Sequence, residues 1–152
     1  MKRNKNLIEL SRDHHHGLLL GWKIKEGLKR NVSVGELANY VSHFAGEALI
    51  PHFEEEENQV LIYLDSDDEY RKRTIREHSE IRDLINNLPE NDKDILLKLA
   101  DLIEAHIRFE ERELFPYIEK TLSVQQLDEM GELIADIHQP YSESYPNEFW
   151  AK

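Results

Sequence analysis

Apolar residues recur at intervals of three, four and seven positions along four long stretches of this sequence, a spacing typical of amphipathic α-helices. The stretches cover about residues 6–29, 34–63, 69–89 and 93–117. Helices of this length that are joined by short connections pack as antiparallel neighbours. The sequence therefore predicts an all-α fold, an up-down-up-down four-helix bundle.

The apolar stripe of each helix predicts which residues face the core. Polar breaks at residues 31–33, 65–68 and 90–92 separate the helices, the last as a cap region. Pro51 should kink the second helix, and Pro116 falls close to the end of the fourth. The main inward-facing apolar residues are expected to be Leu7, Leu10, Leu18, Gly21 and Leu28, then Leu37, Val41, Phe44 and Ala48, then Ile75, Ile81 and Ile85, and finally Leu99, Leu102 and Ile103.

The C-terminal part of the chain should add a short fifth helix. Residues 123–126, with the sequence SVQQ, have the form of a capping box and predict a helix that ends near Ile137. The tail from His138 onward is expected to be irregular, and its pattern leaves open whether its aromatic residues pack on the bundle. With 152 residues we expect a single domain over 1–152, with the bundle at about 6–120 and the C-terminal helix and tail at 121–152.

The composition excludes several classes of function. A formal charge of −12 provides no cationic field for nucleic acid or an anionic membrane, so neither is an expected partner. The absence of cysteine rules out disulfides and thiolate ligands, and there is no nucleophile constellation, phosphate-binding glycine loop or basic aromatic patch. No apolar run has the length of a signal peptide or membrane span, so we expect a cytoplasmic location. The sequence does not determine the oligomeric state.

Histidine and glutamate lie four positions apart on the second and fourth predicted helices, and the residues that follow each pair also align. The two helices therefore form a faint internal repeat. Each of the other two helices carries a histidine near the centre of its apolar stripe. The candidate metal ligands are His14, His52, Glu56, His78, His106 and Glu110.

The direction in which a side chain faces on its helix identifies the candidate ligands better than the spacing between histidine and acid does. Asp and Glu make up 31 of 152 residues, so about one histidine in five should have an acid four positions on by chance. His43 and Glu47 have this spacing but lie on the opposite side of the second helix, where we expect them to be solvated. On the first helix His14 is closest to the centre of the stripe, and His15, about 100° away, is the alternative ligand.

Several residues near the candidate ligands are expected to play other roles. Glu57 and Glu111 point away from the centre and should be solvated. Tyr63 and Tyr117 occupy equivalent places one to two turns past the two glutamates, where core packing is the expected role and lining the site the alternative. His138 lies beyond the bundle and should be structural or exposed.

Two inward-facing glutamates need positive partners, because burying an unpaired carboxylate is costly. No lysine or arginine lies centrally on the four inward faces, and neutral imidazoles compensate a carboxylate poorly. A metal cation between the helices would meet this need. The alternative is a metal-free core in which these side chains hydrogen-bond to each other, or a rotation of the helices that turns them towards water.

Six side chains exceed the four ligands that a structural zinc ion usually takes, so we expect two metal ions. If Glu56 and Glu110 bridge them, each metal receives two imidazoles and two carboxylate oxygens, and an oxo or hydroxo bridge would add a fifth ligand. Ligation by nitrogen and oxygen suits iron, with zinc and manganese as competitors. Two anionic ligands leave a di-iron(II) centre positively charged, which favours peroxide, superoxide, O₂ or NO.

At these residues the sequence resembles the hemerythrin-like family, the hemerythrin HHE cation-binding domain. The resemblance spans about residues 6–120 and rests on the sequences LSRDH at 10–14, HFEEEE at 52–57, EH at 77–78 and HIRFEERELFP at 106–116. It implies a four-helix bundle around a non-haem di-iron centre with a bridging oxygen, held by the same six residues.

The sequence departs from the oxygen carriers of this family on the third helix. They have a second histidine one turn from the first, where this chain has Thr74 and Arg82. The four-histidine set is more similar to bacterial proteins that repair iron centres after nitrosative and oxidative stress, but those usually carry an additional cysteine-bearing domain. We expect a di-iron protein that binds or senses O₂, NO or peroxide, in iron handling or stress response. Iron-centre repair, a zinc or manganese protein and a metal-free helical interaction module are the alternatives.

Overall fold

The computed structural model describes residues 2–88 and 92–151, and no strand occurs among them. Within this part of the chain, no helix is both long enough and apolar enough to cross a bilayer. In chain order the helical segments are α1 (Ile8–Lys29), α2 (Val34–Phe44), η1 (Ala45–Leu49), α3 (Ile50–Glu55), η2 (Glu56–Val60), η3 (Leu61–Tyr63), α4 (Glu69–Asn86), α5 (Lys93–Phe109), η4 (Glu110–Leu114), α6 (Phe115–Thr121), α7 (Val124–Ile137) and η5 (Phe149–Ala151). Among these, η1, η2 and η4 are π-helical, and η3 and η5 are 3₁₀-helical.

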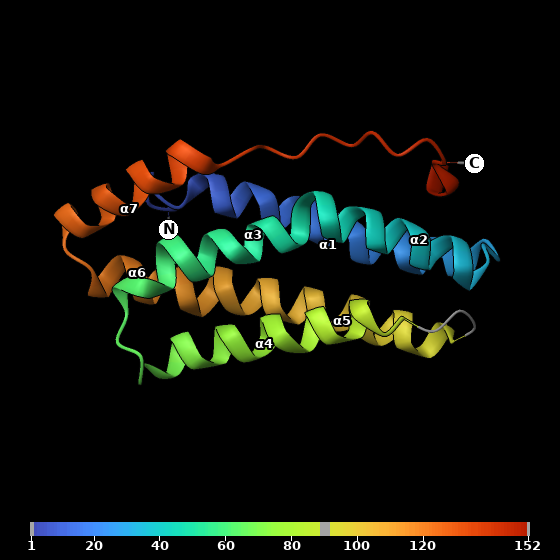
Figure 1. Ribbon diagram of the computed structural model, residues 1–152, viewed down its shortest axis with the longest axis horizontal. Helices are drawn as coiled ribbons and strands as arrows, with labels where there is room; N and C mark the ends of the chain where they lie inside the picture. The colour runs from blue at the N-terminus through green and yellow to red at the C-terminus, as the bar shows by residue number, and fades with distance from the viewer. Residues whose placement is uncertain (1, 89–91, 152) are drawn as a thin grey trace.

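Four long helical runs lie side by side and alternate in direction (Figure 1). The first is α1, the second extends from α2 to η3, the third is α4, and the fourth extends from α5 to α6. α1 packs against α2 and α5, and α4 packs against α5. The prediction of an all-α, up-down-up-down bundle is confirmed, and α7 is the predicted short fifth helix.

Polar side chains cap the helices at the breaks that the sequence indicates. Ser33 accepts a hydrogen bond from the third amide of α2, and Asp68 accepts two from the first turn of α4. Ser123 forms the predicted capping box at the start of α7. α4 ends at Asn86, earlier than expected, and residues 89–91, the expected helix end and the start of the cap region, lie outside the described residues.

The second and fourth helical runs continue through Pro51 and Pro116, and the fourth extends to Thr121. Each proline lies in the first turn of an α-helical segment that directly follows a π-helical one. Proline lacks an amide hydrogen and crowds the carbonyl four residues before it, so a wider turn at this place accommodates the ring. Two of the π-helical segments begin at Glu56 and Glu110, so the internal repeat extends to the backbone geometry.

The predicted core is wrong at two residues, because Leu18 and Ile75 are each 43% exposed. On α1 Gly17 packs closely on α5, because an added Cβ there would lie 2.6 Å from the Ile107 side chain. The helix therefore turns this face inward and leaves Leu18 outside. The core itself consists of two apolar clusters, one including Leu20, Ile24, Leu37, Val41, Phe44 and Leu99, the other Leu7, Leu10, Phe109, Leu114, Phe115 and Met130.

The C-terminal tail packs on the bundle along α1 and α2 (Figure 1), which answers the question that the sequence left open. Phe149 is buried in the core, and Tyr141, Tyr145 and Trp150 pack against it. An added Cβ on Gly27 would lie 3.0 Å from the Phe149 ring, so this glycine makes room for the tail.

A buried cation on α1, Lys23, also holds the tail, although it follows no pattern in the sequence. The Lys23 ammonium donates to the Glu143 carboxylate (3.0 Å) and to the Tyr40 hydroxyl (3.0 Å), and it lies 3.9 Å from the centre of the Trp150 ring. Tyr40 in turn donates to Glu143 at 2.6 Å. Because Glu143 is an anion beside a buried lysine, it links the tail to the bundle electrostatically.

We expect Glu143→Ala to destabilise the protein by about 2 kcal/mol, since it leaves the Lys23 charge and the Tyr40 hydroxyl without their acceptor. Urea unfolding followed by circular dichroism measures the change. The control is Glu148→Ala, which removes the same group from the same tail, because the contacts of Lys23 and Tyr40 involve Glu143 and not Glu148. Equal stability of the two variants would contradict the role assigned to Glu143.

Candidate metal centre

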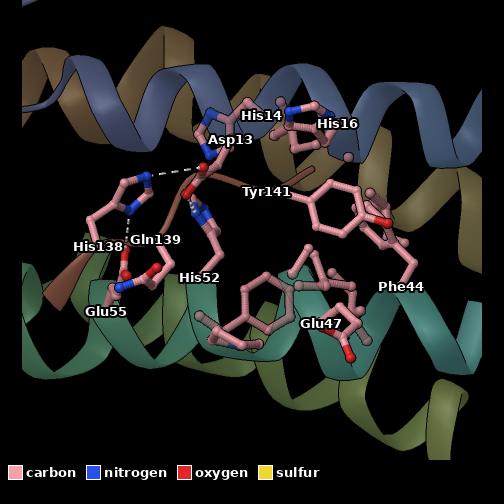
Figure 2. A pocket seen from close by; sticks show the side chains of 18 of the residues that line it. Asp13, His14, His16, Phe44, Glu47, His52, Glu55, His138, Gln139 and Tyr141 are labelled. Carbon is pink, nitrogen blue, oxygen red and sulfur yellow. Dashed lines mark hydrogen bonds and ion pairs between the residues drawn. The ribbon is translucent and has the colours of Figure 1, made fainter. Parts of the chain in front are cut away.

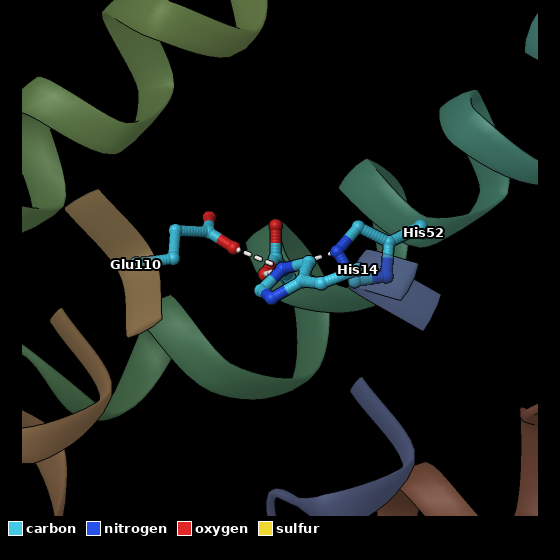
Figure 3. Close-up of side chains that lie close together, drawn as sticks. His14, His52 and Glu110 are labelled. Carbon is cyan, nitrogen blue, oxygen red and sulfur yellow. Dashed lines mark hydrogen bonds and ion pairs between the residues drawn. The ribbon is translucent and has the colours of Figure 1, made fainter. Parts of the chain in front are cut away.

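The six candidate ligands come together in the middle of the bundle, and all of them are buried. Figure 3 shows His14, His52 and Glu110 pointing towards one another from three different helical segments. Glu56, His78 and Glu110 have no exposed surface at all. The predicted facing of these side chains is therefore correct, and they are His14 from α1, His52 from α3, Glu56 from η2, His78 from α4, His106 from α5 and Glu110 from η4.

The donor atoms form two overlapping groups that share both glutamates. One group contains His14 and His52, the other contains His78 and His106, and in each the donor atoms lie within 4.8 Å of one another. Each glutamate directs one oxygen to each group. Each group could hold a metal ion, and Glu56 and Glu110 are common to both groups.

The distances support this division of the carboxylate oxygens. Glu56 places Oε2 3.2 Å from His52 Nε2 and Oε1 3.0 Å from His78 Nε2. Glu110 places Oε1 2.8 Å from His14 Nε2 and Oε2 3.0 Å from His106 Nε2. All four histidines therefore turn the same nitrogen, Nε2, towards the shared carboxylates.

The outer nitrogen of each histidine contacts a carboxylate from another helical run. His14 Nδ1 lies 2.8 Å from Glu111, and His78 Nδ1 lies 2.7 Å from Glu57. The prediction that Glu57 and Glu111 are solvated is wrong, because they face away from the centre but reach these two imidazoles. The other two contacts are His52 Nδ1 to Asp13 at 2.9 Å and His106 Nδ1 to Glu77 at 2.7 Å.

These outer carboxylates fix the chemistry of the inner nitrogens. An imidazole that donates its Nδ1–H to a carboxylate presents the lone pair of Nε2, which is how histidines that bind metals are commonly oriented. The sequence carried one signal for them, since each is adjacent to a candidate ligand. Asp13 and Glu77 precede a ligand histidine, while Glu57 and Glu111 follow a ligand glutamate.

Several inward atoms have no hydrogen-bond partner. They are Nε2 of His52, His78 and His106, both carboxylate oxygens of Glu56, and Oε2 of Glu110. Buried polar atoms without a partner are rare in folded proteins because they lose their hydration without compensation. Lone pairs from imidazole and carboxylate that converge on a closed interior fit one or more metal cations.

Without a cation, protons on the imidazoles balance the two carboxylates. Burial lowers the pKa of His52, but the Glu56 charge and the Asp13 hydrogen bond outweigh it and raise the pKa to about 9. Burial and the neighbouring Glu110 act against ionisation of Glu56, yet the surrounding histidines hold its pKa at about 2. The interior thus contains ionised carboxylates whose positive partners are protons, and metal ions would replace those protons.

Two phenylalanines pack on the ligand rings. Phe53 stacks on His78 with ring centres 3.9 Å apart, and Phe115 stacks on His14 at 5.5 Å. The two phenylalanines therefore restrict rotation of these two imidazoles and keep water from the covered ring faces.

Thr74 stands at one of the positions where oxygen carriers have a further histidine. It is buried and donates to the Tyr70 carbonyl at 2.7 Å.

The remaining histidines lie outside the cluster. His15 is exposed, which leaves His14 as the first-helix residue that faces the centre. His43 is half-buried against the Tyr145 ring rather than fully solvated, while Glu47 is exposed as expected. His138 has a structural contact, 2.8 Å from Nδ1 to the Glu55 carboxylate.

The two tyrosines are partly buried and pack against the core rather than within it. Tyr63 and Tyr117 lie against the apolar cluster that includes Phe115 and Leu114. Tyr117 also donates to Asp68 at 2.5 Å, away from the six ligands.

The all-α bundle and its buried cluster of paired histidines and glutamates are features of helical proteins that bind metal ions in their core. Residues 6–118 match the family described as hemerythrin HHE cation binding domain, and this range includes all six candidate ligands. The chain belongs to that family. Comparisons with curated proteins and with solved structures gave no match.

Proposed function

We propose that this protein holds two iron ions with the six buried residues and binds O₂, NO or peroxide there. The observation that carries the proposal is the pair of donor groups with a common Glu56 and Glu110 and unpartnered inward atoms. Membership of a cation-binding family supports it independently. His14 and His52 would hold one ion, and His78 and His106 the other.

The donor set favours iron over its competitors. The chain offers imidazole nitrogen and carboxylate oxygen and has no cysteine, so metals that prefer thiolate gain no advantage. Mixed nitrogen and oxygen ligation inside a helical bundle is typical of non-haem di-iron proteins. Two carboxylates do not cancel the charge of two divalent ions, so the centre would attract anionic or reducible small ligands. Bound iron would supply the redox-active site for them.

The protein's own residues hold and shield this site. The four outer carboxylates orient the imidazoles, and the stacked phenylalanines exclude water from two of them. The fully buried glutamates fix the spacing between the two halves. Four imidazoles and two carboxylates leave open positions on two metal ions, which is what ligand binding requires.

The test is anaerobic loading with Fe(II), followed by metal analysis and absorption spectroscopy. We expect about two irons per chain and a new absorption band on exposure to O₂ or NO. Expression in iron-replete medium that yields zinc or manganese at full occupancy and no iron would favour those metals instead. Failure to bind iron, or iron that gives no spectral response to either gas, would contradict the proposal.

The outer carboxylates give a prediction for metal affinity. Glu77→Gln should weaken metal binding about 10-fold to 100-fold, because His106 loses the anion that orients its ring and raises its basicity. Competition with a chromophoric chelator measures the affinity. Glu80→Gln, the same change at an exposed position of α4, is the control. If both variants retain the affinity of the unmodified protein, Glu77 does not support the centre.

A further inference from the structure

A cavity of about 330 Å³ lies directly beside the candidate metal centre (Figure 2). Three of the candidate ligands, His14, His52 and His106, form part of its wall. The end of α7 and the tail form another part of the wall, through residues 137–139 and Tyr141. The cavity therefore connects the ligand histidines to the segment of chain that follows α7.

The lining of this chamber is mostly apolar. The side chains come from α1, from the second helical run, from α4 and from α5, so the chamber is built by the whole bundle. The apolar lining includes Phe44, Leu49, Phe53, Ile81, Ile103 and Ile107. Such a surface holds water poorly and gains free energy when an apolar molecule covers it.

The chamber is larger than a diatomic ligand needs. A water molecule has a share of about 30 Å³ in the liquid, and an apolar protein cavity of about 150 Å³ binds benzene. Pockets that bind organic ligands begin at about 300 Å³. A volume of 330 Å³ therefore accommodates a molecule of one or two rings next to the centre.

The charges around the chamber select against anions. Asp13, Glu47 and Glu55 are among its lining residues, and that lining includes no lysine or arginine. The imidazoles beside two of these acids already contact them, His52 with Asp13 and His138 with Glu55, so an organic carboxylate would compete with acidic groups of the protein for these partners. The chain's formal charge of −12 acts in the same direction. An uncharged molecule avoids this repulsion.

The tail keeps the outer wall in place. His138 lies 2.8 Å from Glu55 and 3.4 Å from Asp13, and both contacts are visible in Figure 2. Tyr141 packs edge-on against Phe44, with ring centres 5.2 Å apart. These contacts tie the tail to α1, α2 and α3, so the chamber is a walled space rather than a groove in the surface.

We propose that this chamber binds an uncharged, apolar organic molecule of one or two rings beside the metal centre. The presence of a metal next to the organic molecule rests on the proposed function, whereas binding of that molecule in the chamber does not. The apolar lining selects the organic molecule. Because three of the candidate metal-binding histidines form part of the wall, this molecule would lie next to the position proposed for O₂, NO or peroxide.

Indole is a suitable probe because it is uncharged and has two fused rings. Calorimetric titration is carried out on the protein loaded with iron and on the protein stripped of metal. We expect saturable binding of indole in both forms. In the metal-free form, where no iron attracts an anion, indole-3-carboxylate should bind at least about tenfold more weakly because of the acidic lining. If iron fails to load while indole still binds, the proposed function is contradicted, whereas the proposed binding of an organic molecule in the chamber stands.

Two variants locate the binding. Ala48 lines the chamber, and Ala48→Phe should weaken indole binding at least about tenfold by filling it. Ala38→Phe makes the same change on the same helical run outside the chamber and should bind indole normally. Ala48→Leu, a smaller filler, should give an intermediate loss if the phenylalanine variant does not fold. No binding by the unmodified protein, or full binding by both Ala48 variants, would overturn the proposal.

Discussion

Glu56→Gln is expected to remove both metal ions from the protein, although it changes a single residue. Glu56 belongs to both donor groups, with one oxygen 3.2 Å from His52 and the other 3.0 Å from His78. Glutamine has nearly the same volume but carries no charge and offers one oxygen instead of two. Neither ion would then have its full set of anionic ligands.

Metal analysis after iron loading measures the result. We expect about two irons per chain in the unmodified protein and close to none in Glu56→Gln, because ligand charge is lost from both positions at once. Glu54→Gln makes the same change at an exposed position of α3 and should retain both ions. Glu110→Gln should behave like Glu56→Gln, since Glu110 also belongs to both groups.

A histidine variant distinguishes the shared ligands from the separate ones. His52 belongs to one donor group, so His52→Ala should lose more metal from that half than from the half of His78 and His106. If Glu56→Gln instead lost metal from one half only, Glu56 would not be a bridging ligand. The two-ion arrangement would then need revision even if iron binds.

The inward residues could be predicted because burial follows the helical period. His14, His52, His78 and His106 each fall on an apolar stripe, and such a stripe must face the core whatever its polar members do. The same reasoning failed at Leu18, because the glycine face of α1 allowed a closer approach to α5 and turned the helix. Periodicity indicates a face about 100° wide and cannot place each residue within it.

The outer carboxylates were beyond this kind of prediction. Each of them reaches a histidine on another helical run, as Glu57 reaches His78 and Glu77 reaches His106. Sequence spacing describes neighbours on one helix, where residues one position apart point in different directions. Only the packed bundle brings such pairs together, so a residue that faces away from the centre on its own helix can still contact a ligand.

The tail was unpredictable for a different reason. It has no repeating pattern, and it is held by individual contacts such as Phe149 in the core and Glu143 on Lys23. Those contacts depend on space left by Gly27 and on a lysine that sits 8% exposed on α1. The outer wall of the chamber beside the metal centre consequently escaped sequence reasoning, although the ligands did not.

Removal of metal with a chelator is expected to lower the melting temperature by about 10 °C. A ligand present at about 1,000 times its Kd stabilises the folded state by about 4 kcal/mol, and in a domain of about 150 residues each kcal/mol corresponds to about 2–4 °C. The physical reason is that metal ions satisfy donor atoms that otherwise have no partner, including both oxygens of Glu56. Thermal unfolding followed by circular dichroism, with and without chelator, measures the shift.

The shift should be limited in size because the metal-free centre is not uncompensated. The raised pKa of His52, about 9, keeps this imidazole protonated at neutral pH, so a positive charge remains beside Glu56. The metal-free protein should therefore stay folded and lose stability, rather than unfold as small zinc domains do. Complete unfolding on chelation would show that imidazole protons cannot replace the cations.

A variant that cannot bind metal separates this effect from any direct action of the chelator. Glu56→Gln should show no shift on chelation, because it has no metal to lose.

The double variant His52→Ala and His106→Ala tests the alternative of a metal-free interaction module, in which both histidines would be ordinary core residues. In that case the unmodified protein would melt at the same temperature with and without chelator. A metal-stabilised bundle instead requires that the chelator shift be measurable in the unmodified protein and absent in both variants. The reason is that the same donor atoms are responsible for metal binding and for the added stability.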